Sequence, residues 1–244
     1  MRYFIEFSYN GFNYHGWQMQ PNAITVQEKM NSCVSTLIKK KIELIAAGRT
    51  DTGVHARQMF AHFDCERIND LEDFIFKMNS FLPNDIFIKD VFSVNKDSHA
   101  RFSAISRTYE YYISNSKQVF NPNIYTFFKK LNIDKMNEAS LYLLGEKDFT
   151  SFSKLHSDSY TNICNVSEIK FEKIDENIMF SITSNRFLRN MVRSIVGTLI
   201  DVGTSKIQSD KINYILKMKN RSEAGFSVPA KGLFLTRIIY PKNI

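Results

Sequence analysis

Residues 42–65, IELIAAGRTDTGVHARQMFAHFDC, hold two apolar stretches on either side of a polar segment broken by glycines. The stretch 42–47 is short and apolar, and residues 58–65 alternate between apolar and other side chains, so both are expected to be β-strands. Between them GRTDTGVHA (48–56) is expected to be a loop, whose glycines suit a tight turn or a close approach to a ligand. The loop carries a single carboxylate, Asp51, between two threonines.

The sequence around these strands predicts a β-α-β-β-α-β unit. A capping box at residues 25–28 is expected to open the first helix, because the Thr25 hydroxyl can accept from the amide of Glu28. The order of elements is that of the ferredoxin-like fold. The expected elements are a strand at 2–9, a helix from 25 to about 40, strands at 42–47 and 58–65, a helix from 70 to Pro83 and a strand at 85–94.

The second half of the chain predicts the same order again. The expected elements are a strand at 107–114, a helix at 134–144, a hairpin of strands at 167–174 and 177–183, a helix along the apolar stripe 188–199, a short helix near 210–219 and a strand at 232–240. We therefore expect an α+β protein with two tandem ferredoxin-like lobes, residues 1–104 and 105–244, and a cleft between their sheets. The first lobe holds the loop 48–56.

Composition favours a folded protein with an anionic partner. Of 244 residues, 43% are hydrophobic, and 32 Lys and Arg against 25 Asp and Glu give a net charge of +7. An excess of positive charge points to nucleic acid, although a basic protein without such a partner fits it too. Three scattered cysteines indicate no disulfide framework, and neither a signal sequence nor a long apolar run is found. A reducing, cytoplasmic location is expected, with no membrane association.

The loop 48–56 does not match a phosphate-binding or metal-binding motif. The Walker sequence is absent, and His55, His62 and Cys65 lack the spacing of a zinc site, so no metal is expected. Two interpretations of Asp51 remain. It forms a solvated ion pair with Arg49, which contributes little, or it is a carboxylate kept ionised by the guanidinium and used as a nucleophile.

Several stretches together resemble the tRNA pseudouridine synthase A family, also called tRNA pseudouridine(38–40) synthase. The matching stretches are YNGFNYHGWQMQPNAITVQ (9–27), GRTDTGVHA (48–56), HARFSAISRTYEYYI (99–113), FLRNMVRSIVGTL (187–199) and VPAKGLFL (228–235). The resemblance implies two lobes with a shared, predominantly antiparallel sheet. It also implies isomerisation of uridine to pseudouridine at positions 38–40 of the tRNA anticodon stem-loop, by a homodimer without cofactor or metal.

The resemblance assigns roles to individual residues. Asp51 stands at the position of the family's catalytic aspartate, and Arg49 at that of the arginine paired with it. Tyr109 matches the tyrosine that packs on the target base, and Arg193 matches the arginine that helps to hold the aspartate. Less definite binding roles fall to Arg107, His55 and Gly53. Two departures from the family's usual residues are Thr52 and Phe226.

Other interpretations of these residues remain open. Tyr109 shares a strand face with Tyr111 and Ile113 and fits a core position as well. Arg193, with Arg186 and Arg189, also fits a solvated basic helix face. The loop residue Trp17 fits either RNA stacking or a packed anchor.

The chemistry and the function leave alternatives as well. The Asp51 carboxylate could attack C6 of uracil or C1′ of the ribose. Residues 39–41, three consecutive lysines, fit tRNA contact or a solvated helix end. The rival functions are a pseudouridine synthase acting on another RNA site and a non-catalytic RNA-binding protein, although the characteristic RRM sequence is absent.

Overall fold

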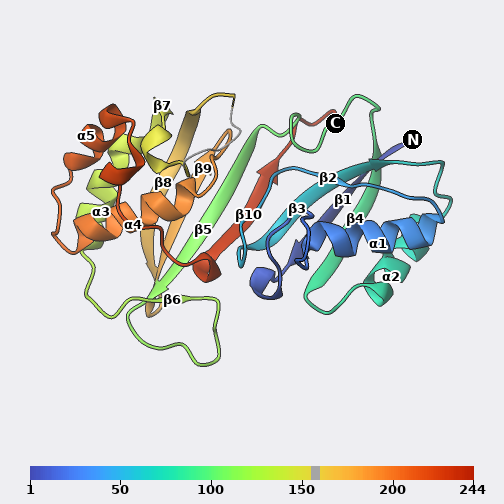
Figure 1. The fold of residues 1–244 in the computed structure, drawn as a ribbon, viewed down its shortest axis with the longest axis horizontal. Helices are drawn as coiled ribbons and strands as arrows, with labels where there is room; N and C mark the ends of the chain where they lie inside the picture. Colours follow the sequence, from blue (N-terminus) through green and yellow to red (C-terminus); the bar gives the residue numbers. More distant parts are fainter. Residues whose placement is uncertain (155–159) are drawn as a thin grey trace. The chain divides into compact units, whose positions relative to one another are not determined.

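The computed structural model describes residues 1–154 and 160–244, which form two compact units (Figure 1). The first unit contains Met1–Ile105 and Phe234–Ile244, and the second contains Ser106–Leu233. Both units combine helices with a mostly antiparallel sheet, so the α+β class predicted from the sequence is confirmed. Within the described residues, no helix is long and apolar enough to cross a membrane.

The first unit has the β-α-β-β-α-β order that the sequence predicts. Its sheet has the order β4-β1-β3, with antiparallel pairing throughout, and β2 pairs antiparallel with β3. The helices α1 and α2 contact each other beside this sheet (Figure 1). The elements are β1 (Arg2–Tyr9), α1 (Val26–Ile38), β2 (Ile45–Ala46), β3 (His55–Asp64), α2 (Leu71–Phe81), β4 (Ile86–Val94) and a 3-10 turn at Gly11–Asn13.

Local sequence signals explain where the two helices of this unit begin. The Thr25 side chain accepts a hydrogen bond from the amide of Glu28 at 3.3 Å, which is one half of the predicted capping box. Asp70 likewise accepts from the amide of Asp73 at 2.9 Å. The second helix ends at Phe81, two residues before the proline that cannot continue it.

The last strand of the chain, β10 (Leu233–Ile239), contributes to the first unit. Phe234 and Leu235 pair in parallel with His55 and Ala56 at the start of β3. Room for this pairing exists because β2 is only two residues long and pairs with Ala61 and His62, near the end of β3. The element order of the sequence predicts residues 234–244 in the second lobe, whereas in the structure they belong to the first unit, where β10 pairs with β3.

Residues 3, 5, 7 and 9 of β1 are buried on one face of the strand. On the other face, where positions 2, 6 and 8 are half-buried, Phe4 is fully buried. Its ring lies within 6.5 Å, centroid to centroid, of the rings of Phe60, Phe92 and Tyr240. The Tyr240 hydroxyl donates to the carbonyl of Ala100, so the chain's last residues cover this face.

The second unit holds a four-stranded antiparallel sheet in the order β5-β9-β8-β7. The predicted hairpin is confirmed as β8 and β9, and a short strand β6 pairs in parallel with the end of β5. The elements are β5 (Ser106–Ser114), β6 (Tyr125–Thr126), α3 (Ile133–Ser140), β7 (Gly145–Asp148), β8 (Ile163–Ile174), β9 (Asn177–Ser184), α4 (Met191–Gly203), α5 (Lys211–Met218) and 3-10 turns at Leu141–Leu143, Thr150–Phe152, Arg221–Glu223 and Ala230–Gly232.

The helix α4 differs from the predicted amphipathic helix. Apart from Arg193, every residue of α4 is buried, so the helix has no solvated basic face. The helix begins at Met191, after Asn190 in a left-handed conformation, so Arg186 and Arg189 precede it. The segment that follows α5 packs directly on α4, since a Cβ built on Gly197 would lie 1.8 Å from the carbonyl oxygen of Phe226.

Candidate functional site

The loop that carries Asp51 is held by hydrogen bonds to the segment after β1. The carbonyl of Thr50 accepts from the amide of Trp17 at 3.2 Å, and the amide of Gly53 donates to the carbonyl of Tyr14 at 3.2 Å. Within the loop, the Val54 amide donates to the carbonyl of Asp51 at 3.1 Å and closes a turn. Asp51 therefore sits in a turn whose backbone is fixed on both sides.

A side-chain hydrogen bond ties the residue before Asp51 to the sheet. The hydroxyls of Tyr9 and Thr50 lie 2.8 Å apart, and both side chains are buried. Since Tyr9 is the last residue of β1, this bond connects the loop to a strand in the middle of the sheet. A buried hydroxyl pair of this kind resists rearrangement, because breaking it leaves polar groups without partners.

Two glycines allow the neighbouring segment to approach the loop closely. Gly16 has φ of +86°, and a Cβ built there would lie 2.4 Å from the carbonyl oxygen of Thr50. A Cβ on Gly11 would lie 2.0 Å from the carbonyl oxygen of Val54. Real side chains do not tolerate such distances, so glycine at both positions is required for this packing.

His55 ends the loop and is buried, with 1% of its surface exposed. Its Nδ1 accepts a hydrogen bond from the amide of Gly11 at 3.0 Å. Its ring also stacks on Phe234, with centroids 4.6 Å apart and planes 23° apart. The imidazole therefore joins β3, β10 and the segment after β1 at the point where the loop enters the sheet.

Asp51 itself is half-buried, and Arg49 is exposed. The exposed Arg49 is accessible to a polyanion. The catalytic role of Asp51 stays a prediction at this point.

Tyr109 lies on β5 and is half-buried. It pairs across the sheet with Ile182, and its ring meets the ring of Phe187 edge to face, with centroids 5.1 Å apart. Tyr111, on the same strand face, is fully buried, and its hydroxyl donates to the carbonyl of Pro229 at 2.8 Å. The core interpretation therefore fits Tyr111, whereas Tyr109 retains an accessible surface.

Two arginines of the second unit are fixed by backbone carbonyls. Nε of Arg193 donates to the carbonyl of Val228 at 2.7 Å, and the amide of Val228 donates back to the carbonyl of Arg193 at 3.2 Å. Nη1 of Arg107 donates to the carbonyl of Asn185 at 2.8 Å. A guanidinium held in this way keeps its charge at a defined place, which suits the binding of an anionic group.

The predicted site residues thus fall into two groups. Asp51, Arg49 and His55 lie together in the loop of the first unit. The second unit holds Tyr109 and Arg107 on β5 and Arg193 on α4. The sequence does not predict the residues that support these groups, which are Tyr9, Thr50, Tyr14, Phe187 and Val228. The glycines at 11 and 16 were a usable signal, since they flank the aromatic segment that packs on the loop.

Trp17 is a packed anchor. It is 3% exposed, and its ring lies 5.6 Å from that of Phe7. Nearby, the Tyr14 hydroxyl donates to Asp85, and burial together with this bond raises the pKa of Tyr14. The aromatic part of this segment therefore supports the loop from within, and RNA stacking by Trp17 does not fit its burial.

Neither a metal cluster nor a disulfide accompanies the loop. Among residues 1–154 and 160–244, no group of three or more His, Cys, Asp or Glu side chains could hold a metal ion. Cys33, Cys65 and Cys164 are free thiols.

A family model and several full-length relatives match this chain and carry the same family name. A family model described as tRNA pseudouridine synthase matches residues 139–241. A protein named tRNA pseudouridine synthase A from Azobacteroides pseudotrichonymphae is 48% identical over 244 residues, covering 100% of this chain and 98% of that protein. Proteins of the same name from Bacteroides fragilis and Porphyromonas gingivalis are 48% and 44% identical, each with 100% of this chain and 98% of the relative covered. The similarity therefore spans both units.

Proposed function

The chain belongs to the tRNA pseudouridine synthase A family, an isomerase family that converts uridine to pseudouridine in tRNA, and from this premise we propose the site and the nucleophile of the reaction. The substrate is uridine at positions 38–40 of the anticodon stem-loop, and Asp51 is the nucleophile. The active protein is a homodimer in the cytoplasm, where its tRNA substrate is found. The fixed backbone of the loop around Asp51 is the observation that supports this proposal most strongly.

A rigid loop matters because covalent catalysis needs a carboxylate held at one place. Hydrogen bonds from Trp17, Gly53 and Tyr9 fix the residues on either side of Asp51. A nucleophile positioned in this way loses little entropy when it reacts, which lowers the barrier substantially. An aspartate in a mobile loop would lack this advantage.

The reaction is an isomerisation, so the product has the same atoms as the substrate, except that the proton lost from C5 is replaced by one gained at N1. The N1–C1′ bond breaks, the uracil turns, and a C5–C1′ bond forms; the C5 proton leaves and N1 gains a proton. Asp51 forms a transient covalent bond, either to C6 of the base or to C1′ of the sugar, and the bond breaks again before release. Either route requires the ionised carboxylate.

The remaining residues hold the substrate. The Tyr109 ring, braced edge to face by Phe187, offers an aromatic face on which the target base stacks after it leaves the helix. Arg193 and Arg107, each fixed to a backbone carbonyl, bind anionic groups of the substrate. Arg49 is exposed and contacts the RNA, whereas the buried His55 maintains the shape of the loop.

The decisive experiment is tritium release from tRNA labelled with [5-³H]uridine. The C5 hydrogen must leave when the base rejoins through C5, so release reports the reaction directly. The wild type is expected to release tritium from a tRNA whose only labelled uridines lie at 38–40, and Asp51→Asn is expected to release none. Asp51→Asn should still bind tRNA within about three-fold of the wild type, because affinity comes from basic residues elsewhere.

Asp175→Asn is the matched control, since it makes the same chemical change at an exposed turn where asparagine suits the positive φ of 53°. It should react like the wild type. Release by a folded Asp51→Asn protein would overturn the nucleophile assignment. No release from this tRNA, together with release from tRNA labelled at its other uridines, would instead show that another RNA site is the substrate.

A further inference from the structure

The segment between β5 and α3 differs in composition from the rest of the second unit. No Asp or Glu occurs between Glu110 and Asp134, although three lysines and several aromatic residues do. The lysines are Lys117, Lys129 and Lys130, and all three are exposed. Their ammonium groups form no ion pair within the described residues, because no carboxylate of this segment is available to them.

The segment forms a loop that is closed at its base. Tyr125 and Thr126 pair in parallel with Ile113 and Ser114, and the amide of Phe127 donates to the carbonyl of Ser114 at 2.7 Å. Gln118 reaches back as well, since its side-chain amide donates to the Ser114 hydroxyl at 3.0 Å. Both ends of the loop are thus fixed to the end of β5, a geometry typical of compact, functional surface loops.

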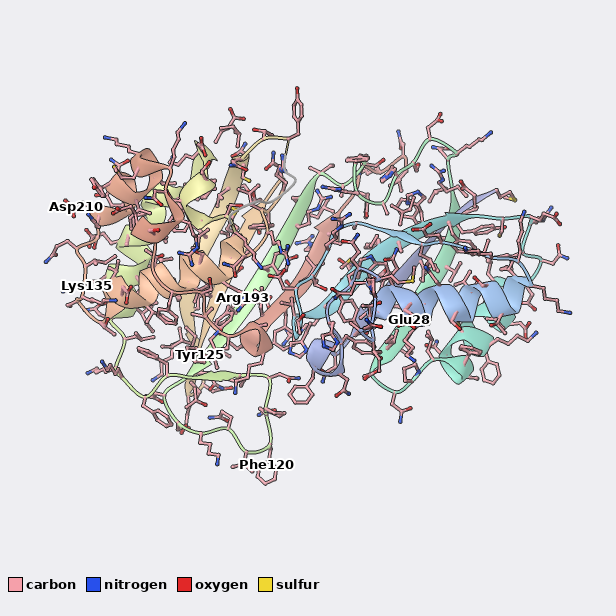
Figure 2. The ribbon with its side chains drawn as sticks, viewed as in Figure 1. Glu28, Phe120, Tyr125, Lys135, Arg193 and Asp210 are labelled. Carbon is pink, nitrogen blue, oxygen red and sulfur yellow. The ribbon has the colours of Figure 1, made fainter. Side chains whose placement is uncertain are left out.

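The tip of this loop presents apolar side chains to solvent. Phe120 is 94% exposed and projects from the tip of the loop in Figure 2. Val119 and Phe128 are 73% and 76% exposed. At the base, by contrast, the ring of Tyr125 lies edge to face on Tyr111, 6.3 Å between centroids. The loop therefore packs one aromatic ring at its base and exposes two phenylalanines in the segment that also carries the three lysines.

This loop is connected by direct contacts to residues of the proposed site. Tyr125 contacts Tyr111, whose hydroxyl donates to the carbonyl of Pro229, and the carbonyl of the adjacent Val228 accepts from Nε of Arg193. Along β5, Ser114 lies five residues from Tyr109, about 16 Å at the usual rise of a strand. An RNA bound at Tyr109 and Arg193 thus reaches the loop if it continues by a few nucleotides along this unit.

We propose that residues 115–130 form a tRNA-binding arm, in which Lys117, Lys129 and Lys130 contact phosphates and Phe120 stacks on an unpaired base. The proposal rests on the function proposed above and extends it to residues outside the stretches that carry the family resemblance in the sequence. Interleaved lysines and aromatic rings are the chemistry that single-stranded nucleic acid requires. If the loops of two copies of the chain packed on each other, their six lysine ammonium groups would repel one another. An anionic occupant such as RNA is therefore favoured by the charges.

The test measures the affinity of the purified full-length protein for an unmodified tRNA transcript at several salt concentrations. Lys129→Ala/Lys130→Ala should weaken binding about ten-fold near 0.1 M salt and reduce the slope of log K against log [salt] by about 1 to 2, because phosphate contacts are lost. Phe120→Ala should weaken binding about five-fold or more with the slope unchanged, since stacking involves no counterion release. Tritium release by both variants should therefore need correspondingly higher tRNA concentrations than release by the wild type.

Each variant has a matched control outside the loop. Lys173→Ala/Lys217→Ala removes two exposed lysines from β8 and α5, and Phe76→Ala removes a ring that is 71% exposed on α2 beside acidic residues. Both controls should bind tRNA within about two-fold of the wild type. Folding of all variants is checked by their unfolding midpoints.

Three results would overturn the proposal. Loop variants that bind tRNA like the controls would exclude the arm, while tritium release by the wild type would leave the proposed function intact. Loss of affinity that follows dissociation of an oligomer, measured by light scattering, would make a second copy the occupant. A wild type that neither binds tRNA nor releases tritium would end the proposed function and the arm together.

Discussion

The backbone amide of Gly11 donates a hydrogen bond to Nδ1 of His55, 3.0 Å away, and both residues are buried. Since Nδ1 accepts, it carries no proton, and the imidazole is neutral with its proton on Nε2. The bond spans 44 residues of sequence and joins the segment after β1 to the start of β3. A histidine that the motif suggested for substrate binding thus has a structural task at the entrance of the loop.

Replacing His55 should separate this structural task from substrate contact. His55→Ala leaves the Gly11 amide without its acceptor, and an unsatisfied buried donor costs about 1–3 kcal/mol of stability. His55→Asn retains an acceptor near the position of Nδ1 and should recover part of the loss. Urea unfolding measures the stability of both variants. Their tRNA affinity, measured separately, should differ from that of the wild type by less than about three-fold. A large loss of affinity in a fully stable His55→Asn protein would favour direct contact with RNA.

Gly16 offers a test of loop position, because its backbone lies against the residues on either side of Asp51. Gly16→Ala introduces a Cβ 2.4 Å from the Thr50 carbonyl oxygen at φ of +86°, so the loop must move. A displacement of about 1 Å at a catalytic group costs on the order of 100-fold in rate, and the tritium-release rate should fall accordingly. tRNA affinity should change little, since the substitution removes no charge.

Gly48 supplies the control for this substitution. It lies in the same loop, but a Cβ built there meets nothing within 4 Å. Gly48→Ala should therefore release tritium at nearly the wild-type rate. Equal losses in Gly16→Ala and Gly48→Ala would mean that flexibility of the loop, and not its position, limits the reaction.

Local sequence chemistry predicted much of the fold. The caps at Thr25 and Asp70 and the hairpin of β8 and β9 depend on residues close in sequence, and each is present as expected. The placement of β10 beside β3 was not predicted, because it depends on the shortness of β2, which a pattern of apolar residues does not reveal. The burial of Phe4 on the second face of β1 was not predicted for a related reason, since Tyr240, which packs on it, comes from the far end of the chain.

The candidate site was predictable only in part. The motif identified Asp51 and its loop, because glycines, charge and position all lie within a few residues of one another. The bonds that fix the loop join residues such as Tyr9 and Thr50, which are 41 apart in sequence, and no local pattern encodes such a pair. The pairing of Arg49 with Asp51 stays a prediction that rests on the motif.

Tyr109 allows stacking to be separated from proton transfer. Tyr109→Phe keeps the ring and its edge-to-face contact with Phe187, so it should preserve tRNA affinity. Tyr109→Ala removes the platform and should weaken binding of the flipped base by about 1–3 kcal/mol. If the hydroxyl removes the C5 proton, tritium release by Tyr109→Phe falls at least about 100-fold; if release is unchanged, the ring alone is needed.

The stability of the first unit should decrease in mild acid because of His62. Burial, with His99 and Arg2 nearby, lowers the pKa of His62 to about 4, against an opposing effect of Asp64. The unfolded chain binds a proton near pH 6.5, so between about pH 6.5 and 4 it holds more protons than the folded protein. Stability is therefore fully present above pH 6.5 and should fall by about 2–3 kcal/mol as the pH approaches 4. Urea unfolding at pH 7.5, 6 and 5 measures the trend.

His62→Gln tests whether this histidine is the cause. The Nδ1 of His62 accepts from the amide of Ala100 at 3.2 Å, and a glutamine oxygen can take over that role without titrating. The variant should therefore lose most of the pH dependence between 7.5 and 5, while His99, whose pKa burial also lowers, retains a smaller share. His15→Gln, at an exposed position, should behave like the wild type. An unchanged slope in His62→Gln would assign the acid sensitivity to other groups, and His62 would then be only a packing residue.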